Sequence, residues 1–364
     1  MKKGVTIKDI ARKLNMSVST VSKALNDHPS ISVLTKERVK KLADEWVYIP
    51  NEAARHFKQN KSFTIGVIMP DLLDQFYVLA INGVEEVAVK NNYNVVVSQS
   101  HEDSERETGL IENMIRNRVD GVIIAVTKKT WNTEKFKRLN TAGIPMVFFS
   151  RSISAPEFDY VSTDNEDGAL QAMNFLFNEG HRRIAHLMGP PFLRTSQQRF
   201  DGYKKALAQK GIPFDTGLVA EVDFTQQQTV DAVKRLMKLK DPPTAFFTFK
   251  SYVGLDVIKI LREKYPKMAG KMSIIGFGNL PLIQYLEDKP MGSIDENSFQ
   301  MGVEAAQLIF DRIDQQEADE EPKPKFIKVP CKIVVHLARK IKTAPYLRRS
   351  ISRHLAPAGW IFGK

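Results

Sequence analysis

The stretch "VTIKDIARKLNMSVSTVSKALN", residues 5–26, is the most informative part of this chain. Its apolar residues, spaced three and four apart, predict an amphipathic helix over residues 6–14 with Thr6 as its cap. A second short helix follows after a turn of two or three residues, and Ser17 is placed to cap it. The hydroxyl and β-branched side chains of this second helix are weak helix formers, which indicates a role beyond helix formation.

A third helix is predicted from Ser32 to Val47, where apolar residues recur on one face. Three short helices with a tight turn between the first two predict an all-α helix-turn-helix domain over residues 1–49. The second helix would enter a DNA major groove about 12 Å wide, where small leading side chains let the backbone approach the bases. Alternatively, its serines only cap and solvate a surface helix.

Positive charge is concentrated at the two ends of the chain, whose net charge is +11. Residues 1–61 carry 13 Lys and Arg against 6 Asp and Glu, and residues 342–364 carry 5 basic and no acidic side chains. The remainder is nearly neutral, with 35 basic and 36 acidic side chains. A small basic domain on a neutral one is typical of nucleic-acid binding, and a solvated basic surface is the alternative.

Residues 5–26, followed by "YIPN" at residues 48–51, resemble the DNA-binding headpiece of lac repressor (LacI/GalR) family transcription regulators. The resemblance implies near-palindromic double-stranded operator DNA as partner, with Val18, Ser19 and Lys23 at the base-reading positions. Lysine at position 23, commonly arginine in the family, keeps the charge but loses the bidentate fork, so looser guanine selection is expected. The other DNA-contacting residues that the resemblance implies are Thr6, Ser17, Thr20, Ser22, Asn26, Asn51, Ala54 and Phe57.

Residues 50–62 form a hinge in that resemblance, and a helix of this length is marginal in water on its own. Phe57 stands where the family has a leucine that wedges into a central minor-groove step. An apolar side chain of this kind can unstack the step and kink DNA. Packing of Phe57 against the large domain or against a second hinge is the alternative.

From Phe63 onward, short apolar runs alternate with amphipathic segments, which predicts an α/β domain with parallel sheets and helices on both faces. About ten such units are too many for one open sheet of usual size, so two similar lobes are predicted. The segments expected to be strands are 63–69, 94–99, 121–126, 145–150, 160–164, 183–189, 219–224, 245–249 and 273–278.

The resemblance to the same family continues to about residue 340, on words such as "RVDGVII" (118–124) and "EGHRRIAHLMGP" (179–190). It implies a Rossmann-like core similar to a periplasmic sugar-binding protein, with two lobes, three crossovers and a ligand cleft between the lobes. The expected first lobe covers about 63–162 and 294–324, and the second about 163–293 and 325–340. The crossovers are expected near 162–165, 290–295 and 323–328.

The effector positions that the resemblance implies are Phe76, Ser150, Arg151, Arg199, Phe224, Lys250 and Gly278. Arg199 keeps the family's effector-clamping arginine, and the two phenylalanines are either ring platforms or ordinary core residues. Ser150 and Gly278 stand where sugar-binding members often have Asp, and Lys250 stands where Asn-Asp is usual. Loss of two carboxylates and gain of a cation favour an acidic sugar derivative or a sugar phosphate as effector. A Lys250 that points to solvent, in a cleft that has drifted or binds nothing, is the alternative.

The sequence contains no phosphate-binding loop, no G-x-S-x-G nucleophile elbow and no histidine spacing typical of a metal site. "GFGNLP" at 276–281 has Pro281 where a dinucleotide-binding loop would need its third glycine. His181 and His186 are read as structural. Neither an enzyme activity nor a cofactor or metal is therefore expected.

A cytoplasmic location is expected, without membrane association. No apolar run approaches the ~20 residues of a membrane span, no signal-peptide core follows the first lysines, and the single Cys331 fits a reducing compartment. A homodimer is expected, with contacts from residues 75–89 and 251–261, so that two recognition helices read the two operator halves. Residues 341–364 are expected to be a disordered basic tail. A solute-binding protein without specific DNA recognition, or an architectural DNA binder, are the competing functions.

Overall fold

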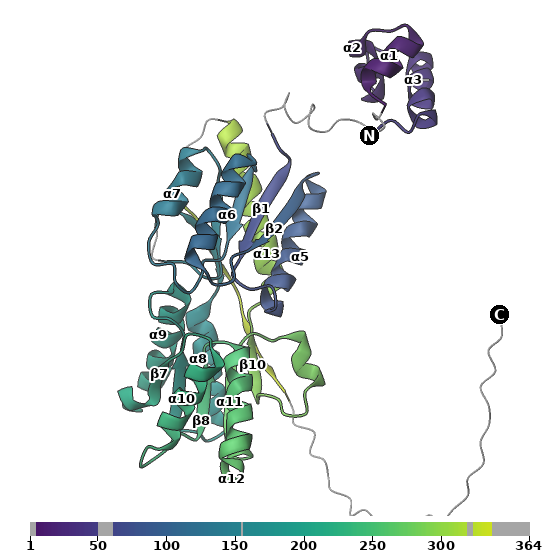
Figure 1. The fold of residues 1–364 in the computed structure, drawn as a ribbon. Coiled ribbons are helices and arrows are strands. Elements are labelled where there is room, and N and C mark those ends of the chain that lie inside the picture. Colours follow the sequence, from purple (N-terminus) through teal and green to yellow (C-terminus); the bar gives the residue numbers. More distant parts are fainter. Residues whose placement is uncertain (1–4, 50–60, 154–155, 319–322, 337–364) are drawn as a thin grey trace, which may run out of the picture.

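The computed structural model describes residues 5–49, 61–153, 156–318 and 323–336. Within them, an all-α headpiece precedes an α/β core of two lobes (Figure 1), which confirms the predicted fold class. Asn51, Ala54 and Phe57 of the predicted hinge lie outside the described residues, as does the basic tail. None of the helices in the described ranges combines the length and the apolarity needed to cross a bilayer.

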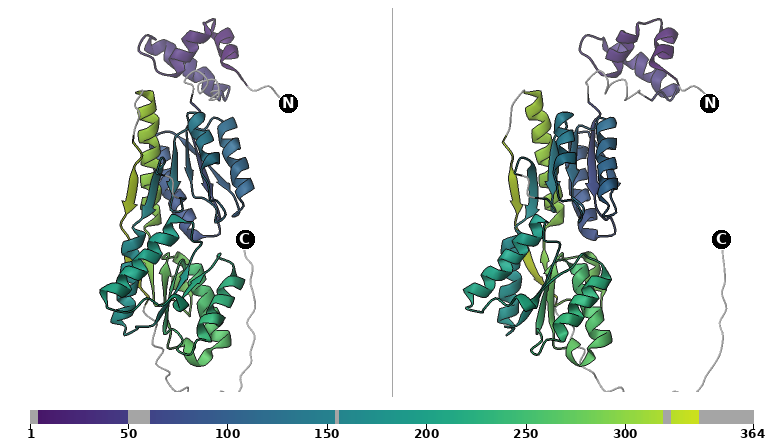
Figure 2. Two further views of the ribbon diagram at one scale, coloured as in Figure 1. Left: turned by 90° about the vertical axis from the view of Figure 1, so that its left-hand side faces the viewer. Right: turned by 60° about the vertical axis from the view of Figure 1, so that its left-hand side comes forward.

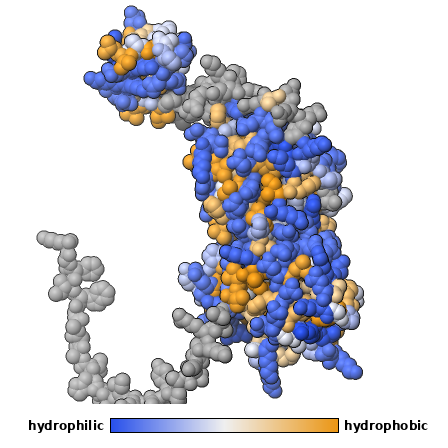
Figure 3. All heavy atoms as spheres, turned by 180° about the vertical axis from the view of Figure 1, so that it is seen from behind, coloured by the Kyte–Doolittle hydropathy of each residue, from blue (hydrophilic) through white to orange (hydrophobic). Residues whose placement is uncertain are grey.

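Three helices form the headpiece: α1 (Ile7–Leu14), α2 (Val18–Leu25) and α3 (Val33–Glu45). The side chain of Thr6 caps α1 and that of Ser17 caps α2, so both predicted caps are confirmed. Ile10, Val21 and Val39, one from each helix, meet in a small core and are fully buried. Hydrophilic atoms predominate on the face of the headpiece seen in Figure 3.

The sheet of the first lobe has six parallel strands in the order β11-β5-β4-β3-β1-β2. Ile65 and Val67 of β1 face the core under α5 and α13, whereas Ile68 faces the core on the other side, with α6 and α7. Helices therefore lie on both faces of the sheet (Figure 2). The bounds are β1 (Thr64–Met69), α5 (Gln75–Lys90), β2 (Asn94–Gln99), α6 (Ser104–Arg116), β3 (Gly121–Ile124), α7 (Glu134–Thr141), β4 (Met146–Phe149), β5 (Asp159–Thr163), α13 (Ser298–Glu317) and β11 (Phe326–Val329).

The second lobe repeats this plan with the order β12-β10-β9-β8-β6-β7, in which only the pairing of β10 with β12 is antiparallel. Helices α8 and α9 cover one face of its sheet, and α10 and α11 cover the other. The bounds are α8 (Asn165–Asn178), β6 (Ile184–Met188), α9 (Arg194–Gln209), η1 (Thr216–Leu218), β7 (Val219–Glu221), α10 (Gln226–Met237), β8 (Ala245–Thr248), α11 (Ser251–Lys264), α12 (Pro266–Ala269), β9 (Ser273–Phe277), η2 (Pro281–Tyr285), β10 (Gly292–Asp295) and β12 (Lys332–Val335).

The chain passes between the lobes after β5, after β10 and between β11 and β12. The third passage differs from the prediction, because β11 pairs in parallel with β5 and so belongs to the first lobe. Residues 325–329 were therefore assigned to the wrong lobe, and so were residues 294–295, which end β10 in the second lobe. Pro330, which cannot donate to a strand ladder, follows β11 directly and ends it. Strands β10, β11 and β12 were not predicted because each of them mixes polar with apolar side chains, whereas the equally short β3 and β4 are continuous apolar runs.

Candidate functional site

The headpiece residues predicted to contact DNA fall into two groups. The side chains of Thr6, Ser17, Thr20 and Asn26 take part in hydrogen bonds at the helix ends, and those of Thr6 and Ser17 cap α1 and α2. Val18, Ser19 and Lys23 are exposed on α2, and 41% of Val18 is accessible although Val21 of the same helix is buried. The free side of α2 thus presents small side chains and one cation, which suits entry into a major groove. Ser22 is half-buried.

Six of the seven predicted effector residues line one cavity between the lobes. They follow the carboxyl ends of strands in the two sheets, where ligands bind in parallel α/β folds. From the first lobe come Phe76, Ser150 and Arg151, and from the second Arg199, Lys250 and Gly278. Phe224 lies outside this lining. Its ring stacks on that of Phe249 with centroids 4.9 Å apart. The guanidinium carbon of Arg151 and the Nζ of Lys250 each lie 5.0 Å from the centroid of the Phe224 ring.

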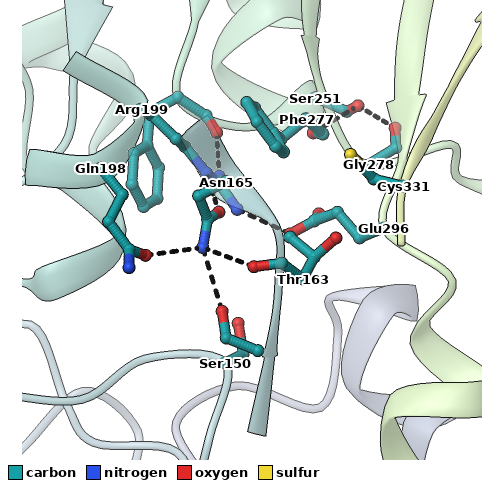
Figure 4. Close-up of polar contacts among 12 residues, drawn as sticks. Ser150, Thr163, Asn165, Gln198, Arg199, Ser251, Phe277, Gly278, Glu296 and Cys331 are labelled. Carbon is teal, nitrogen blue, oxygen red and sulfur yellow. Dashed lines mark hydrogen bonds and ion pairs between the residues drawn. The ribbon is translucent and has the colours of Figure 1, made fainter. Parts of the chain in front are cut away.

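The guanidinium of Arg199 is surrounded by partners from its own chain. Its Nε donates to Asn165 Oδ1 at 2.7 Å and its Nη2 to Glu296 Oε1 at 2.6 Å (Figure 4). Nη1 donates to the carbonyl oxygen of Phe249, and the guanidinium carbon lies 3.7 Å from the ring centroid of Phe277. Burial raises the pKa of the Glu296 carboxyl, and the charge of Arg199 acts against this rise. Removing either partner would leave a buried charge uncompensated.

Arg151 and Lys250 also face carboxylates. Arg151 Nη1 lies 2.7 Å from Glu102 Oε1, and Lys250 Nζ lies 3.6 Å from Asp74 Oδ2. Burial alone would raise the pKa of Glu102, but Arg151, the backbone N–H of Lys128 and the charge of Lys250 together outweigh burial, so that pKa lies below its ordinary value. Lys250 therefore does not point to solvent. Because three carboxylates match the three cations, the cleft is not a cluster of free positive charge, and this removes the main argument for an acidic effector.

Little space remains between these side chains. The cavity measures about 30 Å³, which is room for one or two water molecules, whereas small-molecule sites hold about 300–1,000 Å³. Two hydrogen bonds also join the lobes directly. Lys128 Nζ donates to the carbonyl oxygen of Asp223 at 2.6 Å. The hydroxyl of Tyr252 donates to the carbonyl oxygen of Leu73 at 3.1 Å. The lobes must therefore separate before a molecule of sugar size can enter.

Sequence reasoning missed several residues of the cleft. Asp74 caps α5 after β1, and Glu296 follows β10, so both stand beyond the carboxyl end of a strand, where a search for cleft residues could have found them. Thr195 lies one turn before Arg199 on α9 and lines the cavity. Among the described residues, no hydrogen-bond partner meets its buried Oγ1. That hydroxyl is therefore available to a ligand. Tyr77 adds a second buried ring beside Phe76.

Comparisons with known proteins agree with both parts of this geometry. The model described as "Bacterial regulatory proteins, lacI family" matches residues 6–51, and that described as "Periplasmic binding protein domain" matches residues 65–317. The HTH-type transcriptional repressor CytR of Escherichia coli (strain K12) is 32% identical over 311 residues, 85% of this chain and 90% of CytR. The chain belongs to the lacI family of bacterial regulatory proteins.

Two solved structures are similar to this lacI-family protein over its headpiece and core. The transcriptional regulator CelR in complex with cellobiose has 25% identity and a TM-score of 0.68, covering 91% of this chain and 98% of CelR. The lac repressor dimer bound to operator and the anti-inducer ONPF has 23% identity and a TM-score of 0.77, with the same coverage of both chains. With CytR as a relative, the protein is a transcriptional repressor of the lacI family.

Proposed function

We propose that this lacI-family repressor reads a near-palindromic operator with α2 and is controlled by a small molecule that binds between its lobes. The convergence of six predicted effector residues from both lobes on one cavity carries the proposal. The exposed Val18, Ser19 and Lys23 supply the DNA-reading side. The proposal involves no catalysis and no cofactor, and it places the protein in the cytoplasm, where a bacterial regulator meets its operator.

The effector that fits this cleft best is an uncharged polyhydroxylated molecule, such as a sugar. Phe76, Tyr77 and Phe249 offer ring faces, and the paired cations and carboxylates offer both donors and acceptors to hydroxyl groups. The structurally similar CelR was solved with cellobiose, which is such a molecule. An acidic sugar would have to replace Glu296 at Arg199, and the displaced carboxylate would stay buried without a partner.

Calorimetry with neutral and acidic sugars on the full chain tests this effector chemistry. We expect heat from a neutral sugar only, and we expect Glu296→Gln to admit the corresponding sugar acid because the competing charge is gone. The matched control is Glu166→Gln, which removes a carboxylate from an exposed pair with Lys205. Tighter binding of an acid than of a neutral sugar by the parent protein would refute this chemistry.

Selection of sequences from random DNA tests operator reading. We expect one palindrome to be enriched, and we expect its affinity to fall steeply with salt because Lys and Arg side chains neutralise phosphates. The same selection repeated with each sugar reports whether that sugar releases or strengthens the complex. Equal affinity for every duplex would favour an architectural binder instead, and no DNA binding at all would favour a solute-binding protein.

A homodimer formed through the first lobe would bring two headpieces to one operator. Within the described part of the chain, strand β2 pairs only with β1 and is therefore an edge strand, and it exposes Val96 and Val97. The adjoining helix α5 exposes Val78 and Val89. An exposed apolar edge strand is prone to aggregation unless another chain covers it. Residues 251–261, the second predicted contact, expose less apolar surface, because most of their apolar side chains are buried in their own lobe.

A further inference from the structure

The carboxylate of Asp120 binds the backbone at the point where the chain enters the first lobe from the linker. The backbone N–H groups of Ser62 and Phe63 donate to its two oxygens at 3.0 and 2.7 Å. Asp120 immediately precedes β3, and its own N–H donates to the carbonyl oxygen of Thr64 in β1 at 2.9 Å. Three hydrogen bonds, two of them to a charged acceptor, therefore connect the start of β1 to the start of β3. We call this set of contacts between Asp120 and residues 62–64 the anchor.

Phe63 fixes the direction of the backbone at the anchor. Its φ of 50° lies in the left-handed region that bulky side chains seldom adopt. Its ring lies 5.2 Å from that of Tyr93, which in turn lies 4.9 Å from Phe310 of α13. Its carbonyl oxygen accepts from the N–H of Asn94 at 2.8 Å. An unfavourable backbone conformation persists where surrounding contacts over-determine it, so the chain leaves the lobe in one set direction.

The anchor lies apart from the effector cleft. Asp120 stands at the amino ends of the strands, whereas the cleft residues follow their carboxyl ends. Its hydrogen-bond partners Ser62, Phe63 and Thr64 include no residue predicted to contact DNA or effector. The linker is therefore the direct structural connection between Asp120 and the headpiece. A flexible joint at this point would absorb any movement of the lobe before it reached the headpiece.

We propose that Asp120 is a positioning residue that transmits the orientation of the first lobe to the linker and so to the headpiece. This rests on the proposed function, in which the relative position of the lobes controls operator binding. With the anchor intact, the root of the linker turns with the lobe. With the anchor loosened, the headpiece samples more orientations, and that freedom must be lost when both headpieces bind one operator.

The test is Asp120→Asn in the full chain, measured with the palindrome that the parent protein selects and with a random duplex of equal length. Asparagine keeps the size but has one accepting oxygen, so one backbone N–H loses its partner. We expect operator affinity to fall about tenfold, equivalent to about 1.4 kcal/mol, with affinity for the random duplex unchanged. We also expect trypsin to cut after Lys58 and Lys61 faster than in the parent, both with and without DNA.

The matched control is Asp103→Asn, which alters a carboxylate of the same lobe that accepts the N–H of Arg106 at 2.7 Å at the start of α6. It should leave the operator-to-random ratio and the linker cleavage unchanged. An unchanged ratio and unchanged cleavage in Asp120→Asn would overturn the proposal. An equal loss in both variants, with a lower thermal midpoint, would also overturn it, because that pattern reports general destabilisation.

Hydrogen exchange in the parent protein provides a measurement that does not depend on a variant that folds. We expect the amides of Ser62 and Phe63 to be protected in the free protein, as the contacts to Asp120 require. Rapid exchange at both amides would contradict the anchor. Failure of the parent to select any palindrome would instead contradict the proposed function, while the exchange and trypsin results would still report on the anchor itself.

Discussion

His186 illustrates how burial sets the charge of a single side chain. It lies in the middle of β6 with no accessible surface, and its Nδ1 donates to the carbonyl oxygen of Phe247 at 3.1 Å. The rings of Phe247 and Tyr203 stack on it with centroids 4.6 and 5.2 Å away. Burial lowers the pKa of His186 to about 4. Its contacts are those of a core residue, as the sequence predicted.

The stability of the protein is expected to fall as pH decreases from about 6.5, the ordinary pKa of histidine, towards 4. In that window the unfolded chain binds a proton at His186 that the folded chain does not, which favours unfolding. Above the window both states are neutral, and below it both are protonated, so the loss amounts to about 3 kcal/mol at most. Urea unfolding at several pH values measures it.

His186→Phe should unfold with a flatter pH dependence, because phenylalanine fills the aromatic stack and does not titrate. His28→Gln, a change at an exposed headpiece histidine, is the control and should keep the slope of the parent. The same slope in His186→Phe as in the parent would show that His186 is not the group responsible.

Among the helices, α2 is the one that we propose distinguishes one operator from another. Lys23 is exposed one turn along the helix from Val18 and Ser19. Lysine presents one point charge, whereas arginine presents a planar fork that pairs with the two acceptors of guanine. We expect Lys23→Arg to raise discrimination for guanine at one operator position by about 1 kcal/mol, and Lys23→Ala to abolish it.

Anisotropy titrations with single-base operator variants measure that discrimination. Lys13→Ala, on the exposed side of α1, is the control and should weaken all duplexes alike if it has any effect. Uniform weakening by Lys23→Ala across every operator variant would mean that Lys23 contacts phosphate and not a base.

Helices α5 and α13 pack closely through one glycine on each. A Cβ added to Gly83 would lie 2.1 Å from the carbonyl oxygen of Phe299, and one added to Gly302 would lie 2.0 Å from that of Ala80. Because backbone cannot yield as a flexible side chain can, Gly83→Ala is expected to lower the free energy of unfolding by about 3 kcal/mol. Urea unfolding of the full chain measures the change.

Gly109 in α6 offers the opposite case, because a Cβ there would have no neighbour within 4 Å. Gly109→Ala is therefore expected to stabilise the protein by about 0.5–1 kcal/mol, since alanine loses less backbone entropy on folding. An unchanged free energy of unfolding in Gly83→Ala would mean that α5 and α13 can move apart without loss of core packing.

The proposed function depends on two surfaces of the whole molecule, the cleft between the lobes and the predicted dimer contact. Val78→Asp would place a charge among the exposed valines on α5 and β2, and we expect it to convert the proposed dimer to a monomer. Trp131→Asp removes a larger exposed apolar side chain, 76% accessible, elsewhere in the first lobe and should leave the dimer intact. Sedimentation velocity distinguishes the two states. A Val78→Asp dimer as stable as the parent's would place the contact elsewhere.

Local patterns were sufficient for the headpiece and for most of the sheets. The caps at Thr6 and Ser17 and the helical spacing of apolar residues are signals between neighbours three or four positions apart, so they can be read without knowing the fold. The apolar strand runs are similarly local, and strand β2 has the predicted bounds of residues 94–99. The cluster of predicted effector residues came from the family resemblance, which carries tertiary information that no short pattern contains.

The lobe to which β11 belongs and the charge balance of the cleft depended on contacts between segments far apart in the chain. Phe326–Val329 could have joined either sheet, and its ladder with β5 assigned it to the first lobe. The charge of the cleft was misjudged for the same reason, because Glu296, which neutralises Arg199, is 97 positions away in the chain. Strand partners and ion pairs depend on which segments the folded backbone brings together, and side-chain types alone do not specify that.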